Sequence, residues 1–402
     1  MKPSKKKKKW IKTRHKIITK IASLILYPYT CWKYRIKIER FKEQGNRQYL
    51  VLMNHQTPFD QFFIGMAFRG AIYYIATEDI FSLGWLSSLL RFAVAPIPIK
   101  KQTTDIGAVK TCYRVAKEGG TIALAPEGNR TYSGRTEYMN PAIVSLARTL
   151  KLPIALFRIE GGYGTCPRWS DVVRKGKMRA YVSRVVEPEE YGNLSDDQLL
   201  TLIQEGLYVN EASADRKFHH PKLAEYLERA IYVCPYCGLS TFESHNDTIE
   251  CKKCNRQIKY LPTKELKGVG FDFPFQFVAE WYDYQCDFVN NLSLDMPMDE
   301  ILYTDKVSLS EVIVGKRKKL LFKNMSMRMY ADRIECTAKN QTFNYDDITG
   351  MAVMGRNKLN FVHNGKTYQV KGNKRFNALK YMNIFYRYKN IKEGQNGTFL
   401  GI

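Results

Sequence analysis

The sequence lacks an apolar run long enough to cross a bilayer. Its N-terminal apolar stretch, Ile17 to Trp32, is shorter than the roughly 20 residues that a spanning helix needs, and it contains Lys20 and Pro28. A cleaved signal peptide also fits poorly, because this apolar core is interrupted and no small-residue cleavage site follows it. We therefore expect the segment to lie in a membrane interface. The alternative is a packed first helix behind a solvated basic tail.

Further absences narrow the possible chemistry. No Gly-x-Ser-x-Gly sequence is present, so a covalent serine mechanism built on a nucleophile elbow has no support. No internal repeat is found along the chain. The nine cysteines do not form a disulfide scaffold, because five of them are scattered: Cys31, Cys112, Cys166, Cys286 and Cys336. This usage favours a reducing compartment.

Acidic residues are few relative to basic ones. The chain has 39 Asp and Glu against 63 Lys and Arg, a net charge of +24, which indicates an anionic partner such as nucleic acid, an acidic protein or an anionic membrane face. The N-terminus favours the membrane, because the run Lys5 to Lys9 precedes a segment rich in Tyr and Trp, whose rings sit at headgroup depth. We expect a peripheral or monotopic protein on the cytoplasmic face of the cell membrane, with anionic membrane phospholipids and no nucleic acid as partners.

Four cysteines form a metal-site pattern. Cys234-Pro-Tyr-Cys237 and Cys251-Lys-Lys-Cys254 are two Cys-x2-Cys pairs separated by 13 residues, a spacing typical of a zinc ribbon. Four thiolates fill a tetrahedral Zn²⁺ site and leave no position for substrate, so we expect the zinc to be structural. Two disulfides or a degenerate ribbon are the alternatives, and the scattered cysteines argue against disulfides.

Short apolar runs alternate with helical patterns in the first half of the chain. The runs are Tyr49 to Met53, Ile72 to Ala76, Val94 to Ile99, Thr121 to Ala125, Ile154 to Ile159 and Ala180 to Val186. One helix is expected around Val109 to Ala116, a second starts at Asn140-Pro141, and Ser195 caps a third. This alternation predicts an α/β domain with a mixed sheet.

The last third of the chain has a different pattern. Alternating runs predict strands over Lys319 to Phe322, Arg328 to Tyr330, Lys358 to Val362 and Thr367 to Val370. Asn364-Gly365 is a hairpin signal, and helices are expected at about Phe277 to Val289 and Asn377 to Tyr388. This order predicts a β-rich domain closed by a helix. In outline it is similar to pleckstrin-homology-like domains, which bind headgroups or proteins; the alternative is a scaffold that only steadies the rest of the chain.

A histidine and an aspartate in Asn54-His55-Gln56-Thr57-Pro58-Phe59-Asp60 form the first candidate catalytic motif. On an unbroken helix, five residues turn through about 500° and leave the two side chains about 140° apart, so the pair can meet only across a turn. The sequence supplies one, because an apolar strand precedes the motif and Asp60 can start the next helix. His55 would then stand at a strand end, where α/β sheets bind ligands.

This pair suits general-base chemistry. A neutral imidazole can take the proton from an acceptor hydroxyl if a carboxylate fixes its tautomer and supports the imidazolium. His55 would be the base and Asp60 the carboxylate. In isolation, however, the motif is better explained by a histidine satisfied in a turn and an aspartate that caps the next helix.

A second motif, Ala125-Pro126-Glu127-Gly128-Asn129-Arg130, also follows a strand directly. Arg130 offers a planar fork to phosphate oxygens, and Gly128 lets the backbone come close, while Glu127 could instead orient Arg130. The alternative is an ordinary strand-end turn with a surface ion pair. Together, NHQTPFD and APEGNRTYSGR resemble, in order and spacing, the first and third blocks of the glycerolipid acyltransferase family, which includes 1-acylglycerol-3-phosphate acyltransferases.

The resemblance covers about residues 45 to 190 and implies an enzyme with His55 as general base and Asp60 as its orienter. It implies that Glu127, Gly128 and Arg130 bind the acceptor phosphate, together with Lys101, which stands where the family's second block commonly has an Arg. The implied reaction moves a fatty acyl group from acyl-CoA or an acyl carrier protein to the free hydroxyl of lysophosphatidate, in phospholipid synthesis.

Two departures from the family pattern affect the acceptor. Lys101 binds phosphate as a point charge without the arginine fork, and Leu156 stands where the fourth block often has a second proline. The alternatives are therefore a different lysophospholipid or a lipid amine as acceptor. A further alternative is a non-catalytic adaptor that binds membrane or nucleic acid.

The expected organisation has six regions. They are a basic amphipathic membrane-anchoring segment (1–40), an acyltransferase domain (41–210), a helical linker (211–230), the zinc ribbon (231–262), a second helical linker (263–300) and a β-rich pleckstrin-homology-like domain (301–392). The expected fold class is α/β: a mixed-sheet αβ acyltransferase domain, a small zinc ribbon and a β-rich C-terminal domain closed by a helix.

Overall fold

The computed structural model describes residues 9–77, 81, 84–99, 105–136, 138–313, 318–337, 341–394 and 399–401. The chain forms two compact units. Unit 1 consists of Met1–Arg130, Thr136–Glu160 and Lys177–Val209, and unit 2 consists of Thr131–Arg135, Gly161–Gly176 and Asn210–Ile402. Two short segments within the first half of the sequence therefore belong to the second unit.

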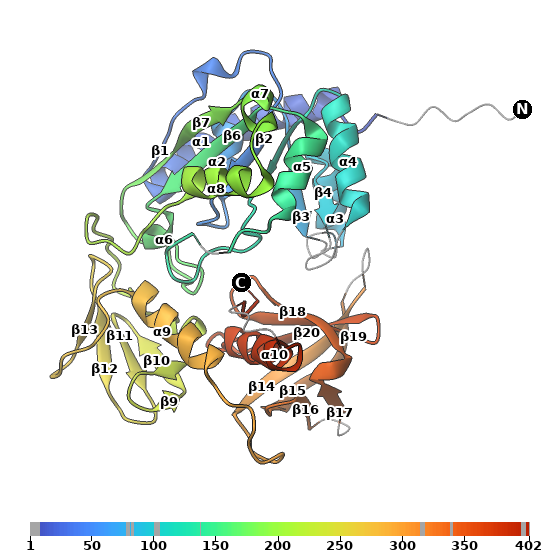
Figure 1. Ribbon diagram of the computed structural model, residues 1–402. Coiled ribbons are helices and arrows are strands. Elements are labelled where there is room, and N and C mark those ends of the chain that lie inside the picture. Colours follow the sequence, from blue (N-terminus) through green and yellow to red (C-terminus); the bar gives the residue numbers. More distant parts are fainter. Residues whose placement is uncertain are drawn as a thin grey trace, which may run out of the picture. The chain divides into compact units, whose positions relative to one another are not determined.

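Unit 1 is built on one seven-stranded mixed sheet (Figure 1). Its strands are β1 (Ile36–Ile38), β2 (Leu50–Met53), β3 (Ile72–Thr77), β4 (Ile97–Ile99), β5 (Thr121–Leu124), β6 (Ile154–Glu160) and β7 (Met178–Val186). Their spatial order is β1-β7-β6-β2-β5-β3-β4, with β7 antiparallel to β6 and the other neighbours parallel. The sheet confirms the predicted α/β fold class, although β4 begins at Ile97 rather than at Val94.

Helices cover both faces of this sheet. They are α1 (Thr13–Tyr34), η1 (Lys42–Gln44), α2 (Asp60–Ala67), α3 (Trp85–Ala93), α4 (Ile106–Lys117), α5 (Ala142–Leu150), α7 (Pro188–Gly192) and α8 (Asp196–Leu207). On one face, α4, α5 and α8 share a hydrophobic cluster with Leu156 of β6. Successive strand residues point to opposite faces, and the next residue, Phe157, packs against Phe68 at the end of α2. Ser195 caps α8 in a capping box with Gln198, as predicted.

The strands at the centre of the sheet are buried on both faces. Leu50, Val51 and Leu52 of β2 are each 0% exposed, which explains why this strand is a continuous apolar run in the sequence. β2 pairs in parallel with β5 on one side and with β6 on the other. The carboxyl ends of three strands therefore lie side by side, and the loops that follow them meet at one edge of the sheet.

Helix α1 has an exposed apolar stripe. Ile17, Ile21 and Leu24, at helical spacing, are each more than half exposed. The C-terminal end of the helix is fixed, because Tyr34 is buried and its ring lies 5.1 Å from that of Phe59. Among the residues that the structure describes, no helix is both long and apolar enough to cross a membrane.

The first part of unit 2 combines small sheets with a helix. β8 (Val233–Cys234) pairs with β9 (Gly238–Leu239). A separate antiparallel sheet consists of β10 (Phe242–His245), β11 (Thr248–Cys251), β12 (Gln257–Tyr260) and β13 (Leu266–Gly268). Two short helices, α6 (Gly162–Thr165) and η3 (Leu227–Arg229), also belong to this unit. α9 (Val278–Asn290) buries Trp281 completely. The indole nitrogen of Trp281 donates to the carbonyl of Val233 at 2.8 Å, so the helix is fastened to β8.

The last part of unit 2 is a curled antiparallel half-barrel that ends in a helix (Figure 1). Its elements are β14 (Tyr303–Val312), β15 (Lys319–Met329), β16 (Arg333–Cys336), β17 (Gln341–Asn344), η5 (Tyr345–Asp347), β18 (Ile348–Met354), β19 (Lys358–His363), β20 (Lys366–Gly372) and α10 (Leu379–Lys392). Asn364 and Gly365 both have positive φ, 49° and 71°, as the predicted two-residue hairpin turn requires. The predicted β-rich domain closed by a helix is therefore confirmed.

Candidate functional site

β2, a turn and α2 bring His55 and Asp60 together. β2 ends at Met53 and α2 begins at Asp60, so the chain reverses between them. His55 Nδ1 lies 2.8 Å from Asp60 Oδ2. The carboxylate is completely buried, whereas 24% of the imidazole side chain is exposed. Because Nδ1 faces the carboxylate, a base at this position would act through Nε2.

The turn wraps around the Asp60 carboxylate. Its oxygens accept hydrogen bonds from the backbone N–H groups of Gln56, at 2.7 Å, and Thr57, at 2.9 Å, and from the Thr57 hydroxyl at 2.6 Å. The Thr57 hydroxyl oxygen also accepts the N–H of Phe59 at 3.1 Å. These bonds hold Asp60 independently of His55, so the carboxylate can fix the position of the imidazole.

Replacing Thr57 with valine is expected to weaken this anchoring. Valine keeps the shape of the side chain but removes a hydroxyl that donates to a buried carboxylate, and hydrogen bonds to charged groups contribute about 1.5 to 3 kcal/mol. We expect the free energy of unfolding to fall by about that amount and turnover to fall with it, whereas Thr57→Ser should retain both. Denaturant unfolding of the two variants measures the change in stability, and their initial rates measure the change in turnover. Equal stability of Thr57→Val and the wild type would contradict the expectation.

Asn54 ties the end of β2 to β6. Its side-chain nitrogen donates to the carbonyl of Ile159 at 2.8 Å, and its side-chain oxygen accepts the N–H of the same residue at 2.7 Å. The last backbone pair between these strands is Met53 with Phe157. The amide of Asn54 therefore continues the β2–β6 ladder beyond its end and fixes the backbone immediately before His55.

The second motif lies beside the first because β2 and β5 are parallel neighbours, with Leu52 paired to Leu124. The loop after β5 starts with a turn in which Gly128 N–H donates to the carbonyl of Ala125 at 3.0 Å. From this loop, Glu127 Oε1 accepts the backbone N–H of His55 at 2.9 Å, across 72 residues of sequence. A direct hydrogen bond therefore joins the two motifs.

The remaining predicted binding residues are placed as follows. Gly128 has a φ of +67°, a conformation that favours glycine. Arg130 closes the same loop, and only 9% of it is exposed. Lys101 lies outside the described residues. Of the residues predicted for this site, the structure thus joins His55, Asp60 and Glu127 by hydrogen bonds and places Gly128 and Arg130 on the loop of Glu127.

Three contacts at this site were not anticipated from the sequence: the Asn54 amide on β6, the Thr57 hydroxyl on Asp60, and the Glu127 carboxylate on the His55 backbone. A signal was available for the first two, because Asn and Thr in turns commonly bond to nearby backbone or carboxylate groups. The third depends on which strands are neighbours, and no local pattern reports that.

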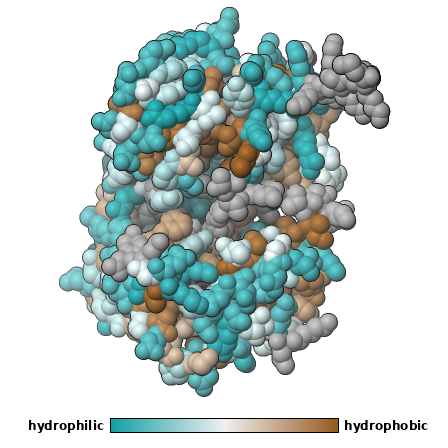
Figure 2. Space-filling view, turned by 45° about the vertical axis from the view of Figure 1, so that its right-hand side comes forward, coloured by the Kyte–Doolittle hydropathy of each residue, from teal (hydrophilic) through white to brown (hydrophobic). Residues whose placement is uncertain are grey.

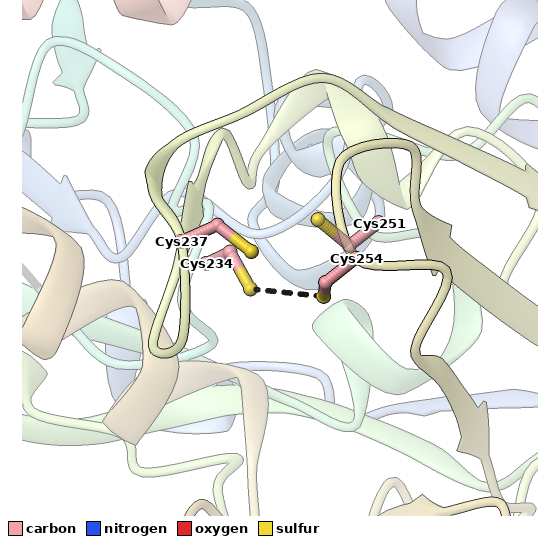
Figure 3. Close-up of side chains that lie close together, drawn as sticks. All are labelled: Cys234, Cys237, Cys251 and Cys254. Atoms are coloured by element: carbon pink, nitrogen blue, oxygen red, sulfur yellow. Dashed lines mark hydrogen bonds between the residues drawn. The ribbon is translucent and has the colours of Figure 1, made fainter.

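The four predicted zinc ligands converge in unit 2 (Figure 3). Cys234 and Cys237 come from the β8–β9 hairpin, and Cys251 and Cys254 from the end of β11 and the turn after it. The four sulfur atoms lie within 4.8 Å of one another, and Sγ of Cys234 is 3.9 Å from Sγ of Cys254. A tetrahedral Zn²⁺ with Zn–S bonds of about 2.3 Å needs sulfurs about 3.8 Å apart, so the set fits a structural zinc. None of the four is in a disulfide.

Comparison with known proteins relates the region that contains both motifs to one family. Residues 34–159 match the acyltransferase family model. A 1-acyl-sn-glycerol-3-phosphate acyltransferase of Bacillus subtilis is 22% identical over 136 residues, 34% of this chain and 65% of the relative. A chloroplastic 1-acyl-sn-glycerol-3-phosphate acyltransferase of Brassica napus is 22% identical over 189 residues, 45% of this chain and 52% of the relative.

Each of these curated relatives is matched over less than two thirds of its own length. Among solved structures, the 1-acyl-sn-glycerophosphate acyltransferase of Thermotoga maritima is 20% identical, with a TM-score of 0.40, over 48% of this chain and 78% of that one. His55, Asp60, Glu127 and Arg130 all lie within the matched residues 34–159.

Proposed function

We propose, on the premise that residues 34–159 form an acyltransferase domain distantly homologous to 1-acyl-sn-glycerol-3-phosphate acyltransferases, that this chain acylates lysophosphatidate. It moves a fatty acyl group from an acyl thioester to the free hydroxyl of the acceptor, in phospholipid synthesis. The observation that carries the proposal is the 2.8 Å contact between His55 and the buried Asp60, made beside the Glu127 loop.

In this mechanism His55 is the general base. Asp60 accepts the hydrogen bond from Nδ1–H, which leaves Nε2 as the basic nitrogen and stabilises the imidazolium once it forms. Nε2 takes the proton of the acceptor hydroxyl while the hydroxyl oxygen attacks the thioester carbonyl carbon. When the C–S bond breaks, the same proton passes from the imidazolium to the leaving sulfur, so the base is regenerated.

The acceptor phosphate is assigned to the loop after β5. Arg130 supplies a planar cation for phosphate oxygens and Gly128 keeps the backbone open there, while Lys101 would add a second cation. The Glu127 carboxylate accepts the backbone N–H of His55, so Glu127 also holds the base beside this loop. The acyl donor is acyl-CoA or an acyl carrier protein, since both are acidic and suit a chain of net charge +24.

The same proposal places the protein on the anionic, cytoplasmic face of the cell membrane. The sequence from Lys9 to Ile38 contains no acidic residue, and α1 exposes an apolar stripe along this basic segment. The C-terminal end of α1 reaches the catalytic turn, because Tyr34 packs on Phe59. A lipid acceptor in the leaflet would therefore lie close to His55.

The test is acyl transfer by purified protein in lipid vesicles, with acyl-CoA or acyl carrier protein as donor and a panel of labelled lyso-lipids as acceptors. Transfer to lysophosphatidate in preference to unphosphorylated acceptors supports the proposal. Absence of transfer to every acceptor with both donors would refute it.

Arg130→Ala is expected to lose activity toward phosphorylated acceptors selectively. Hydrogen bonds to charged groups contribute about 1.5 to 3 kcal/mol, so kcat/KM for lysophosphatidate should fall roughly 10- to 100-fold, with a smaller change for monoacylglycerol. Arg184→Ala on β7, an exposed arginine away from both motifs, is the matched control and should leave both rates unchanged. An equal loss on both kinds of acceptor would contradict a role in phosphate binding.

A different lysophospholipid, or a lipid amine, is the second candidate acceptor. Lys101 replaces an arginine fork by a point charge, and Leu156 departs from the family pattern in β6. The same acceptor panel separates this candidate from the first, because the second candidate predicts faster transfer to an acceptor other than lysophosphatidate.

A further inference from the structure

Helix α3 (Trp85–Ala93) turns an apolar face outward. Trp85, Leu89 and Phe92, spaced four and three residues apart, are 74%, 48% and 51% exposed, whereas Ser87 on the opposite side is buried. A surface helix of a soluble protein has the reverse arrangement, with its polar face in water. Figure 2 shows that hydrophobic residues reach the surface in brown patches among hydrophilic ones. An exposed apolar helix face of this kind marks an interaction surface.

α3 is attached to α1, the helix proposed to lie on the membrane. The guanidinium of Arg14 lies 4.1 Å from the centre of the Phe92 ring, and its Nε donates to the Phe92 carbonyl at 3.1 Å. Trp10 Nε1 donates to the carbonyl of Ala95 at 3.2 Å. These contacts join the C-terminal end of α3 to the start of α1, so the two apolar faces belong to helices that pack directly on each other.

The charges carried by α3 and by the N-terminal segment match an anionic surface. No acidic residue occurs from Gly84 to Ile99, and the helix carries an exposed Arg91. The adjoining segment from Lys9 to Ile38 has only basic charges. Exposed Trp and Phe beside Arg and Lys are typical of helices that lie at the level of lipid headgroups.

We propose that α3 is a second membrane-docking helix, whose Trp85, Leu89 and Phe92 enter the interface of an anionic bilayer alongside α1. Its nine residues extend over only about 14 Å, so the helix lies in the interface and does not cross the bilayer. The inference extends the proposed membrane location and does not depend on the identity of the acyl acceptor.

Tryptophan fluorescence tests whether α3 enters lipid. Trp10, Trp169 and Trp281 are common to Trp32→Phe and Trp32→Phe/Trp85→Phe, so the difference in emission between these two variants reports Trp85. Vesicles of phosphatidylcholine and phosphatidylglycerol should shift this difference emission to shorter wavelength, and lipids brominated on the acyl chain should quench it. An unshifted, unquenched Trp85 in protein that sediments with the vesicles would overturn the proposal.

A substitution on the helix gives an independent measurement. Leu89→Glu places a charge in the docking face and should weaken partition onto these vesicles at least about tenfold, whereas Leu89→Phe should not. Gln204→Glu, at an exposed position of α8, adds the same charge and should bind like the wild type. Unchanged binding by Leu89→Glu would overturn the proposal. Neither measurement requires turnover, so a negative result here leaves the proposed acyl transfer standing.

Discussion

Replacing His55 with alanine is expected to reduce acyl transfer by about 10²- to 10⁴-fold, the range that general-base catalysis contributes. The substitution removes the imidazole whose Nδ1 binds Asp60, and with it the atom that takes the acceptor proton in the proposed mechanism. The effect should appear in kcat with little change in KM, because the base acts on the transition state rather than on the bound acceptor. Initial rates with saturating thioester and varied lysophosphatidate measure both quantities.

The fold should survive this substitution. Asp60 keeps three other donors, namely Gln56 N–H, Thr57 N–H and the Thr57 hydroxyl, so no buried carboxylate is left unpaired. His219→Ala is the matched control, since this exposed histidine lies in unit 2. We expect His55→Ala and His219→Ala to unfold at the wild-type temperature, and only the first to lose activity. Wild-type turnover by His55→Ala would remove the basis of the proposed mechanism.

Stripping the metal from the four-cysteine site is expected to unfold the surrounding part of unit 2. Binding free energies of structural zinc in small domains are about 10 to 16 kcal/mol, more than a small sheet gains from its own core. Trp281 reports the change, because its indole donates to Val233 next to Cys234 and its ring packs on Phe242 at 5.4 Å. A chelator should therefore move the Trp281 emission to longer wavelength as zinc leaves the protein.

Cys251→Ser should give the same result without a chelator. Cys251 is fully buried, and its loss leaves three thiolates for a metal that prefers four ligands in structural sites. We expect bound zinc, measured by elemental analysis, to fall from one per chain to a small fraction. Cys31→Ser in α1 changes a cysteine outside the cluster and should retain the metal. Full zinc content in Cys251→Ser would exclude the four-thiolate site.

The secondary structure of both units was largely predictable, for identifiable reasons. β2 and the first four residues of β6 are buried on both faces and therefore appear in the sequence as continuous apolar runs. Ser195 and the pair Asn364-Gly365 act locally, through a cap and a positive-φ turn, so the structure reproduces them where they were expected. Likewise, the spacing of the four cysteines was sufficient to predict that their sulfur atoms converge.

Long-range order was not predictable in the same way. The neighbours of β2 are β5 and β6, which follow it by about 70 and 100 residues, and the antiparallel direction of β7 has no local signature. Hence the Glu127 contact on His55 does not follow from the sequence, although the sequence shows both motifs. The outward apolar face of α3 was missed for a related reason: periodicity gives a helix two faces but does not say which one the fold covers.

The hydrogen bond between Glu127 and the His55 backbone makes the two motifs the fixed ends of a long chain segment. That segment runs from α2 through β3, α3, β4 and α4, and it returns to the centre of the sheet in β5. Within this segment, α3 takes no part in the hydrogen bonds that position His55, which come from Asp60, the Glu127 loop and the tie between Asn54 and β6. Exchanging α3 for a foreign helix would therefore change the proposed docking face and keep the bonds that position His55.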